Sequence, residues 1–155
     1  MAQEETDYVL AQLVELVNRS DMEFSVTVAS NGLMITGTLV SNQTWFDRQA
    51  DLIRAGSGMQ DDEVGLHTIF EGWRDRNREA TAEDKQVEDA LKDIELPHRF
   101  QQAIDETAQQ AGYIHLAKAR YVVQQGFVPA EGMLWRGRLD AITGWSVGEL
   151  RAGKP

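Results

Sequence analysis

Histidines and carboxylates are the side chains best suited to chemistry in this chain, because it contains no cysteine. The three histidines are His67, His98 and His115. At helical spacing, Asp62, Glu63 and His67 would share one face of a helix and could ligate a metal ion. Two carboxylates and one histidine on a polar helix are more commonly a solvated surface. We therefore expect no metal site and no cofactor.

Motifs for nucleophilic catalysis or phosphate binding are missing from the sequence. No spacing of serine, histidine and aspartate supports a catalytic triad. The Gly-Ser-Gly run at residues 56–58 has no strand before it and no lysine after it, unlike a phosphate-binding loop. We therefore predict that the protein is not an enzyme. An enzyme that uses His67 with nearby acids remains an alternative.

Tryptophan and arginine alternate in the run MLWRGR at residues 133–138. In a strand, Trp135 would face one side while Arg136 and Arg138 face the other, so we expect a substantially buried tryptophan and exposed arginines. Arg120, on a neighbouring predicted strand, would add a third charge. Since arginine binds carboxylates through paired hydrogen bonds, Arg120, Arg136 and Arg138 are candidate protein-binding residues. A merely solvated row of charges is the alternative.

The composition is typical of a soluble globular protein, with 42% hydrophobic and 26% charged residues. A length of 155 residues predicts a single domain over residues 1–155, large enough to fold without a disulfide or a metal. No apolar run approaches the ~20 residues that a membrane span needs, and the acidic N-terminus does not resemble a signal peptide. We therefore expect a cytoplasmic protein with no membrane partner.

The net charge of −10 is distributed unevenly along the chain. Residues 1–42 carry −5, residues 43–112 carry −8 and residues 113–155 carry +3. Proteins that bind nucleic acid need positive charge for their phosphate contacts, so the total charge argues against a nucleic-acid partner. The positive C-terminal segment could instead dock on an acidic surface, including that of another copy of the chain.

The first third of the chain predicts one helix followed by two strands. Apolar residues at three-to-four spacing indicate a helix at 6–18, with Thr6 as its N-cap. Alternating apolar residues indicate strands at 23–30 and 33–41, and Leu33, Ile35 and Leu39 would share one face of the second. The Asn-Gly pair at 31–32 is the strongest short signal for a hairpin turn. A glycine at position 37 indicates a bulge or a sharp bend in the second strand.

Helices are predicted in the middle of the chain and strands at its end. The expected helices cover residues 43–55, 61–80, 81–94 and 97–110. Thr81 with Asp84 resembles a capping box that would begin the third of these helices. The expected strands cover residues 113–123, 133–142 and 144–150, with a loop at 124–132 and a tight turn at Thr143-Gly144. In the first strand, Ala117, Ala119, Tyr121 and Val123 would share one face.

These elements together predict an α+β fold. Five short strands suit a small bent antiparallel sheet or a partly open barrel of the SH3 or Sm type. The sheet would follow an N-terminal helix and would be interrupted by a helical insertion at about residues 43–112.

Three runs of the sequence together resemble the gas vesicle accessory protein U (GvpU) family. They are FSVTVASNGLMITGTLVSNQTWFD, YIHLAKARYVV and MLWRGRLDAITGWSVGEL, in that order. The matching positions are Asn31, Gly32, Ile35, Gly37, Ser41, Phe46, Ile114, His115, Leu116, Trp135, Arg136, Gly137 and Gly148. The helical insertion is longer than the family pattern leads us to expect, and a polar C-terminal tail is reduced to residues 151–155.

The resemblance implies a non-enzymatic accessory protein of gas vesicles. Such a protein self-associates or binds gas vesicle proteins and affects vesicle clustering, so its expected partners are those proteins and further copies of itself in a homo-oligomer. The family provides no catalytic residues to transfer to this chain.

A second resemblance concerns the predicted N-terminal helix and the run VTVASNGLMITGTL. This combination is similar to the first motif of Sm-like small barrels, which bind RNA through loops at ring interfaces. The long insertion, the negative charge and the absence of a basic loop argue against that function here. A small-barrel RNA-binding module is therefore the alternative function.

Overall fold

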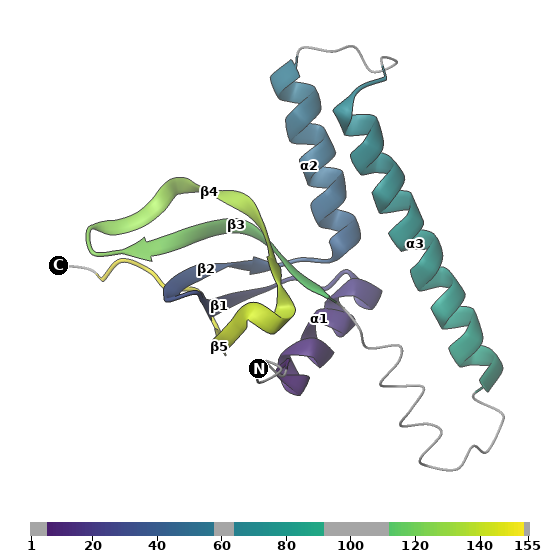
Figure 1. Cartoon of the computed structure of the whole chain (residues 1–155), viewed down its shortest axis with the longest axis horizontal. Helices are drawn as coiled ribbons and strands as arrows, with labels where there is room; N and C mark the ends of the chain where they lie inside the picture. Colours follow the sequence, from purple (N-terminus) through teal and green to yellow (C-terminus); the bar gives the residue numbers. More distant parts are fainter. Residues whose placement is uncertain (1–5, 58–63, 92–111, 154–155) are drawn as a thin grey trace. The chain divides into compact units, whose positions relative to one another are not determined.

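The computed structural model describes residues 6–57, 64–91 and 112–153. The chain forms two compact units (Figure 1). The sheet unit comprises residues 1–41 and 111–155, and the helical unit comprises residues 42–110.

The sheet unit consists of one helix and five antiparallel strands in the order β4-β3-β2-β1-β5. Its elements are α1 (Tyr8–Ser20), β1 (Phe24–Ser30), β2 (Leu33–Leu39), β3 (Tyr113–Val123), β4 (Gly126–Arg138), the 3₁₀ helix η1 (Leu139–Ala141) and β5 (Ile142–Val147). In the part of the chain that the structure describes, the two outer strands do not pair with each other, so the sheet is not closed. The prediction of an α+β fold with five antiparallel strands is confirmed.

The connection between the last two strands differs from the prediction. The predicted loop at 124–132 is mostly strand, because a tight turn at Gln124-Gln125 lets β4 begin at Gly126 and pair with β3. An outer strand tolerates Pro129, whose missing N–H is not needed on the unpaired side. The predicted tight turn at Thr143-Gly144 is also wrong. The 3₁₀ helix η1 joins the strands instead, and β5 pairs with β1 at the opposite edge of the sheet.

This short connection requires a strongly curved sheet. Five strands laid flat at ~4.8 Å spacing would separate their outer members by ~19 Å, whereas three residues of 3₁₀ helix advance only ~6 Å. The ends of β4 and β5 must therefore approach each other, which the predicted bent sheet allows.

Helix α1 contributes its apolar face to the core of the sheet unit. Leu10, Val14 and Val17 are almost fully buried and belong to one cluster with residues from all five strands or their connections. The N-cap is Asp7 rather than the predicted Thr6, because the Asp7 carboxylate accepts a hydrogen bond from the Leu10 N–H at 3.0 Å. That hydrogen bond, followed by one from the Trp145 side chain, lowers the pKa of the Asp7 carboxyl.

The β1–β2 hairpin forms as predicted. Asn31 and Gly32 have φ values of 52° and 77°, the two positive values that a type I′ turn requires. Ile35 and Leu39 are buried in the core, but Leu33 is 49% exposed because it lies next to the turn, where the core ends.

A bulge at Lys118 interrupts the regular pairing of β3. Lys118 has a φ of 51°, and the register shifts around it toward both neighbouring strands. The core-facing positions therefore change from Ile114 and Leu116 before the bulge to Ala119 after it. The prediction that Ala117 and Ala119 share a face is wrong, because the extra residue lies between them.

Two glycines on the strands beside β3 make room for this bulge. A Cβ at Gly132 of β4 would lie 2.7 Å from the Lys118 Cα, and Gly132 also has a φ of +82°. A Cβ at Gly37 of β2 would lie 3.0 Å from both the Ala117 carbonyl oxygen and the Ala119 Cα. The irregularity that we predicted at Gly37 thus belongs to β3, and Gly37 permits the close approach of that strand.

The helical unit contains α2 (Asn42–Ser57) and α3 (Leu66–Leu91). The two helices are antiparallel, because Arg54 near the end of α2 pairs with Glu71 near the start of α3, and Gln43 bonds to Thr81 further along. Four aromatic rings lie at the contact between the helices. Their centroid distances are 5.2 Å for Trp45–Phe46, 5.9 Å for Phe46–Trp73 and 5.0 Å for Phe70–Trp73.

Helix α3 continues through Thr81, where we predicted a cap and a new helix. The Thr81 hydroxyl donates to the Asn77 carbonyl oxygen at 2.9 Å, one turn back in the same helix. A threonine can satisfy its hydroxyl in this way inside a helix, so the predicted capping box does not form. The helix predicted at 97–110 lies outside the described residues.

The glycines beside the Lys118 bulge generate a testable prediction. Gly132→Ala and Gly37→Ala should each lower the free energy of unfolding by about 2 kcal/mol, because a Cβ meets backbone atoms and, at Gly132, φ is unfavourable. Chemical denaturation followed by circular dichroism measures this loss. Gly144→Ala is the matched control, since a Cβ there meets no atom within 4 Å. Equal midpoints for all three variants would contradict the argument.

Candidate protein-binding surface

The candidate surface lies where the start of β3 pairs with the end of β4. Tyr113 is opposite Arg138, and His115 is opposite Arg136. The intervening Ile114 belongs to the buried core. Since successive residues of a strand face opposite sides, these four side chains share the outer face of the sheet, opposite the core that α1 covers.

Arg136 is held between two neighbours on this outer face. Its Nε donates a hydrogen bond to His115 Nε2 at 3.1 Å, and its guanidinium carbon lies 3.6 Å from the centre of the Tyr113 ring. The stacked ring and the hydrogen bond both restrict the side chain, which is nevertheless exposed. Arg136 therefore presents a positive charge in a preset direction.

His115 is a buried, neutral neighbour of Arg136 and not a titrating group near pH 7. Burial, followed by the positive charge of Arg136, lowers the pKa of His115 to about 3. Because Nε2 accepts the hydrogen bond from Arg136, the proton of the neutral ring is assigned to Nδ1. The imidazole can orient the guanidinium, but it cannot act as a general acid or base at neutral pH.

Arg138 extends further into solvent than Arg136. Its side chain is 67% exposed and forms an ion pair with Asp140, which follows two residues later at the start of η1. Exposed pairs of this kind contribute little stability, so Arg138 can exchange this carboxylate for another at small cost.

Arg120 has a different environment from the other two arginines. It donates a hydrogen bond to Glu149 at 2.7 Å, lies 4.5 Å from the centre of the Phe127 ring, and has a side chain that is only 22% exposed. Five residues of strand separate it from His115, or about 16 Å. The structure thus brings Arg136 and Arg138 together, whereas Arg120 ties the segment after β5 to the sheet.

Trp135 is partly buried, and not substantially buried as we expected. It packs against the core, and its Nε1 donates to the Tyr121 hydroxyl at 3.1 Å. The indole covers Gly137 on the same strand, since a Cβ there would lie 2.2 Å from the ring. In the Trp-Arg-Gly run, tryptophan and glycine therefore form the inner side and arginine the outer side.

Of the three histidines of the sequence analysis, the structure describes His67 and His115. His67 is only 2% exposed in the helical unit, so it is not on the solvated helix face that we expected. Asp62, Glu63 and His98 lie outside the described residues. Within residues 6–57, 64–91 and 112–153, no three side chains of the types that ligate metals are grouped closely enough to hold an ion.

A family model for the gas vesicle protein GvpU-like family matches residues 7–150, which include every element described above. The chain belongs to this family. The resemblance found in the sequence is therefore confirmed, and the GvpU-like chain is a gas vesicle-related protein. Neither the curated proteins nor the solved structures include a match to it. Of the helices in the described ranges, none has the length and apolar character needed to cross a membrane.

Tyr113 and His115 were not recognised in the sequence as neighbours of the arginines in this GvpU-like chain. The sequence did contain one signal for this. Tyr113 and His115 are two residues apart on β3, and Arg136 and Arg138 are two residues apart on β4, so each pair must share one face of its strand. The register of the two strands was needed to place them together. It could not be derived while residues 126–132 were interpreted as a loop.

The depressed pKa of His115 predicts a specific dependence of stability on pH. In the unfolded chain this histidine binds a proton below about pH 6.5, whereas in the folded chain it stays neutral down to about pH 3. The folded state should therefore lose about 2 kcal/mol between pH 7 and pH 4.5 through this residue. His115→Gln keeps an acceptor for Arg136 and should remove this part of the loss, as measured by chemical denaturation at both pH values.

The comparison of variants isolates His115 from the carboxyl groups that titrate over the same range. Identical pH dependence in the wild type and in His115→Gln would show that His115 is not held neutral. In Arg136→Gln, histidine NMR titration should show a higher pKa for His115, still below its ordinary value because burial is the larger cause.

Proposed function

We propose that this protein is a non-enzymatic accessory protein of gas vesicles that acts in the cytoplasm. It binds gas vesicle proteins or further copies of itself and so affects the clustering of vesicles. The observation that carries the proposal is the family match over residues 7–150.

The outer face of the sheet supports a contact with an acidic protein surface. Arg136 and Arg138 are both exposed, and Arg136 is oriented by Tyr113 and His115. Guanidinium groups fixed in this way favour carboxylates, which they bind with geometric specificity. In this proposal Arg136 and Arg138 make the contact, and Arg120 holds the segment after β5 in place through Glu149.

A flotation experiment tests both the function and the residues. Intact gas vesicles rise during low-speed centrifugation, so a bound protein is recovered in the floating layer. The wild-type protein should float with vesicles, and Arg136→Ser/Arg138→Ser should reduce the floating fraction about tenfold at low salt and less at high salt, where charges are screened. Cluster size by light scattering should fall in parallel.

The control variant is Lys118→Ser/Arg151→Ser, which removes two other exposed positive charges of the same unit. It changes the net charge equally and should float like the wild type. Wild-type protein that stays below the vesicles would refute the proposed function. Equal losses in both variants would show that total charge, and not the Arg136–Arg138 pair, governs binding.

A further inference from the structure

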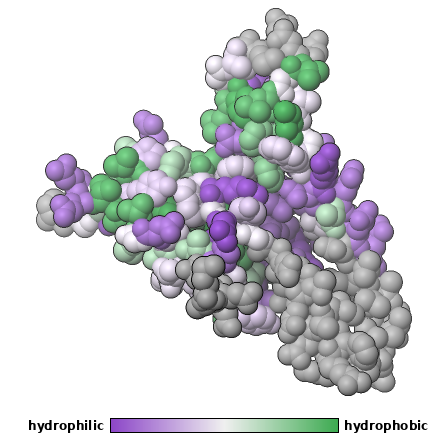
Figure 2. All heavy atoms as spheres, viewed as in Figure 1, coloured by the Kyte–Doolittle hydropathy of each residue, from purple (hydrophilic) through white to green (hydrophobic). Residues whose placement is uncertain are grey.

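The second half of α3 extends past the start of α2 and is strongly acidic. Gln43, near the start of α2, bonds to Thr81, and α3 continues from there to Leu91. Figure 2 shows hydrophilic side chains over the middle of α3. Residues 79–96 contain seven acidic and two basic residues, and the last turn of α3 has no basic residue. Since acidic groups are unfavourable near the negative end of a helix dipole, this stretch would be stabilised by positive charge from elsewhere.

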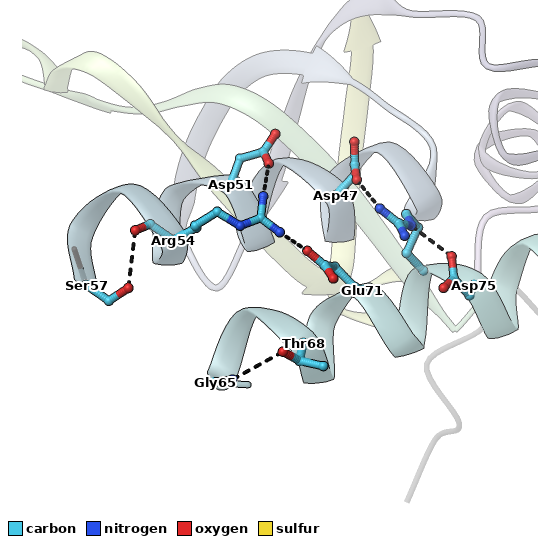
Figure 3. A network of polar contacts seen from close by, with 9 residues as sticks. Asp47, Asp51, Arg54, Ser57, Gly65, Thr68, Glu71 and Asp75 are labelled. Atoms are coloured by element: carbon cyan, nitrogen blue, oxygen red, sulfur yellow. Dashed lines mark hydrogen bonds and ion pairs between the residues drawn. The ribbon is translucent and has the colours of Figure 1, made fainter. Parts of the chain in front are cut away.

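The first half of α3, in contrast, has its charges paired with α2 or within the helix. Arg54 of α2 forms an ion pair with Glu71 (Figure 3). Arg74 forms ion pairs with Asp47 of α2 and with Asp75. These charges are therefore satisfied inside the helical unit, and a charged contact with another molecule would use the residues that follow.

A row of three exposed charges begins directly after this paired region. Arg76, Glu79 and Glu83 follow one another by three and four residues, so they share one face of α3. Phe70 and Arg74, which contact α2, lie on the nearly opposite face at 3.6 residues per turn. Among the residues that the structure describes, neither glutamate has an ion-pair partner. From Glu83 back to Arg76, the charges are negative, negative and positive.

The outer face of the sheet unit carries the opposite order of charges. Along the end of β4 and the start of η1, Arg136 and Arg138 are positive and Asp140 is negative. Alternate residues of a strand are ~6.6 Å apart, and residues four apart in a helix are ~6 Å apart along its axis. The two arginines therefore match the spacing of Glu79 and Glu83. Because Tyr113 and His115 orient Arg136, little side-chain freedom would be lost when it pairs.

Charge complementarity favours another copy of the chain as the partner of this face. The net charge of −10 opposes contact between two copies over most of their surface. Residues 113–138 are an exception, because they contain four basic residues and one acidic residue. Their best match within the sequence is the acidic second half of α3.

We propose that Arg136 and Arg138 bind the second half of α3 of another copy of this chain. Arg136 would face Glu83, Arg138 would face Glu79, and Asp140 would face Arg76. The two surfaces differ, so each copy can use one of them toward each of two neighbours, which gives open chains of molecules and not closed dimers. The inference deepens the proposed function and rests on the self-association that this function includes.

Charge-reversal variants of the full-length protein test the contact by sedimentation velocity. Exposed ion pairs are individually weak, so the wild type should associate progressively as its concentration rises. Arg136→Glu/Arg138→Glu and Glu79→Arg/Glu83→Arg should each raise the dissociation constant at least tenfold, because like charges would then face each other. An equimolar mixture should restore association, since each variant supplies the surface that the other lacks. Both variants keep a negative net charge, so total charge does not explain such a recovery.

The matched control is Lys118→Glu/Arg151→Glu, which reverses two other exposed positive charges of the sheet unit. It has the same net charge as Arg136→Glu/Arg138→Glu and should associate like the wild type. Equal losses in these two variants would overturn the inference.

A cross-linking experiment covers the case in which the charge-reversed variants do not fold. The chain has no cysteine, so Glu79→Cys and Arg138→Cys each introduce a single thiol. When the two are mixed, a short bismaleimide should join one chain of each kind. Lys118→Cys mixed with Glu79→Cys is the control and should give few cross-linked pairs.

The outcomes separate this inference from the proposed function. A wild type that stays monomeric at all concentrations would overturn the inference, and if it still floats with vesicles the proposed function stands. A cross-link within a single dilute chain that carries both Glu79→Cys and Arg138→Cys would also overturn it, because the chain's own α3 would then occupy the arginines. If the wild type associates through these charges but does not float with vesicles, the inference stands and the proposed function fails.

Discussion

The three-residue connection from β4 to β5 is the constraint on which the sheet unit depends. It joins strands at opposite edges of one sheet, so the sheet must curl until those edges approach each other. Curvature of this degree needs local irregularity, which the Lys118 bulge supplies between two glycines without side chains. The concave side of the curl then encloses a core that a single short helix, α1, can complete.

The same curl separates structural from surface residues on β4. Trp135 and Gly137 lie on the inner side, where the indole occupies the space that a glycine leaves. Arg136 lies on the outer side, where His115 and Tyr113 fix its direction. The core and the charged outer surface thus use alternate residues of one strand, which explains why tryptophan and arginine occur together in so short a run.

Local signals in the sequence predicted the features that depend on neighbouring residues alone. The Asn31-Gly32 turn is an example, because its geometry follows from two backbone conformations. The pairing of β5 with β1 could not be predicted in this way, since their contact depends on residues more than 100 positions apart. The bulge at Lys118 could not be predicted either, because a lysine in the sequence does not indicate that its backbone will adopt a positive φ. The surroundings of Arg136 were missed for the same reason, since they require the register of β3 and β4.

The helical unit is inserted between two strands that are hydrogen-bonded neighbours, β2 and β3. The chain therefore leaves the sheet and returns to it at adjacent positions, secured where the Val40 N–H donates to the His115 carbonyl oxygen at 3.1 Å. Loop-closure entropy grows only with the logarithm of length, so doubling such an insertion costs about 0.6 kcal/mol. Evolution can lengthen, shorten or exchange this segment while the sheet keeps its register, and a protein engineer could graft a foreign helical hairpin at the same junction.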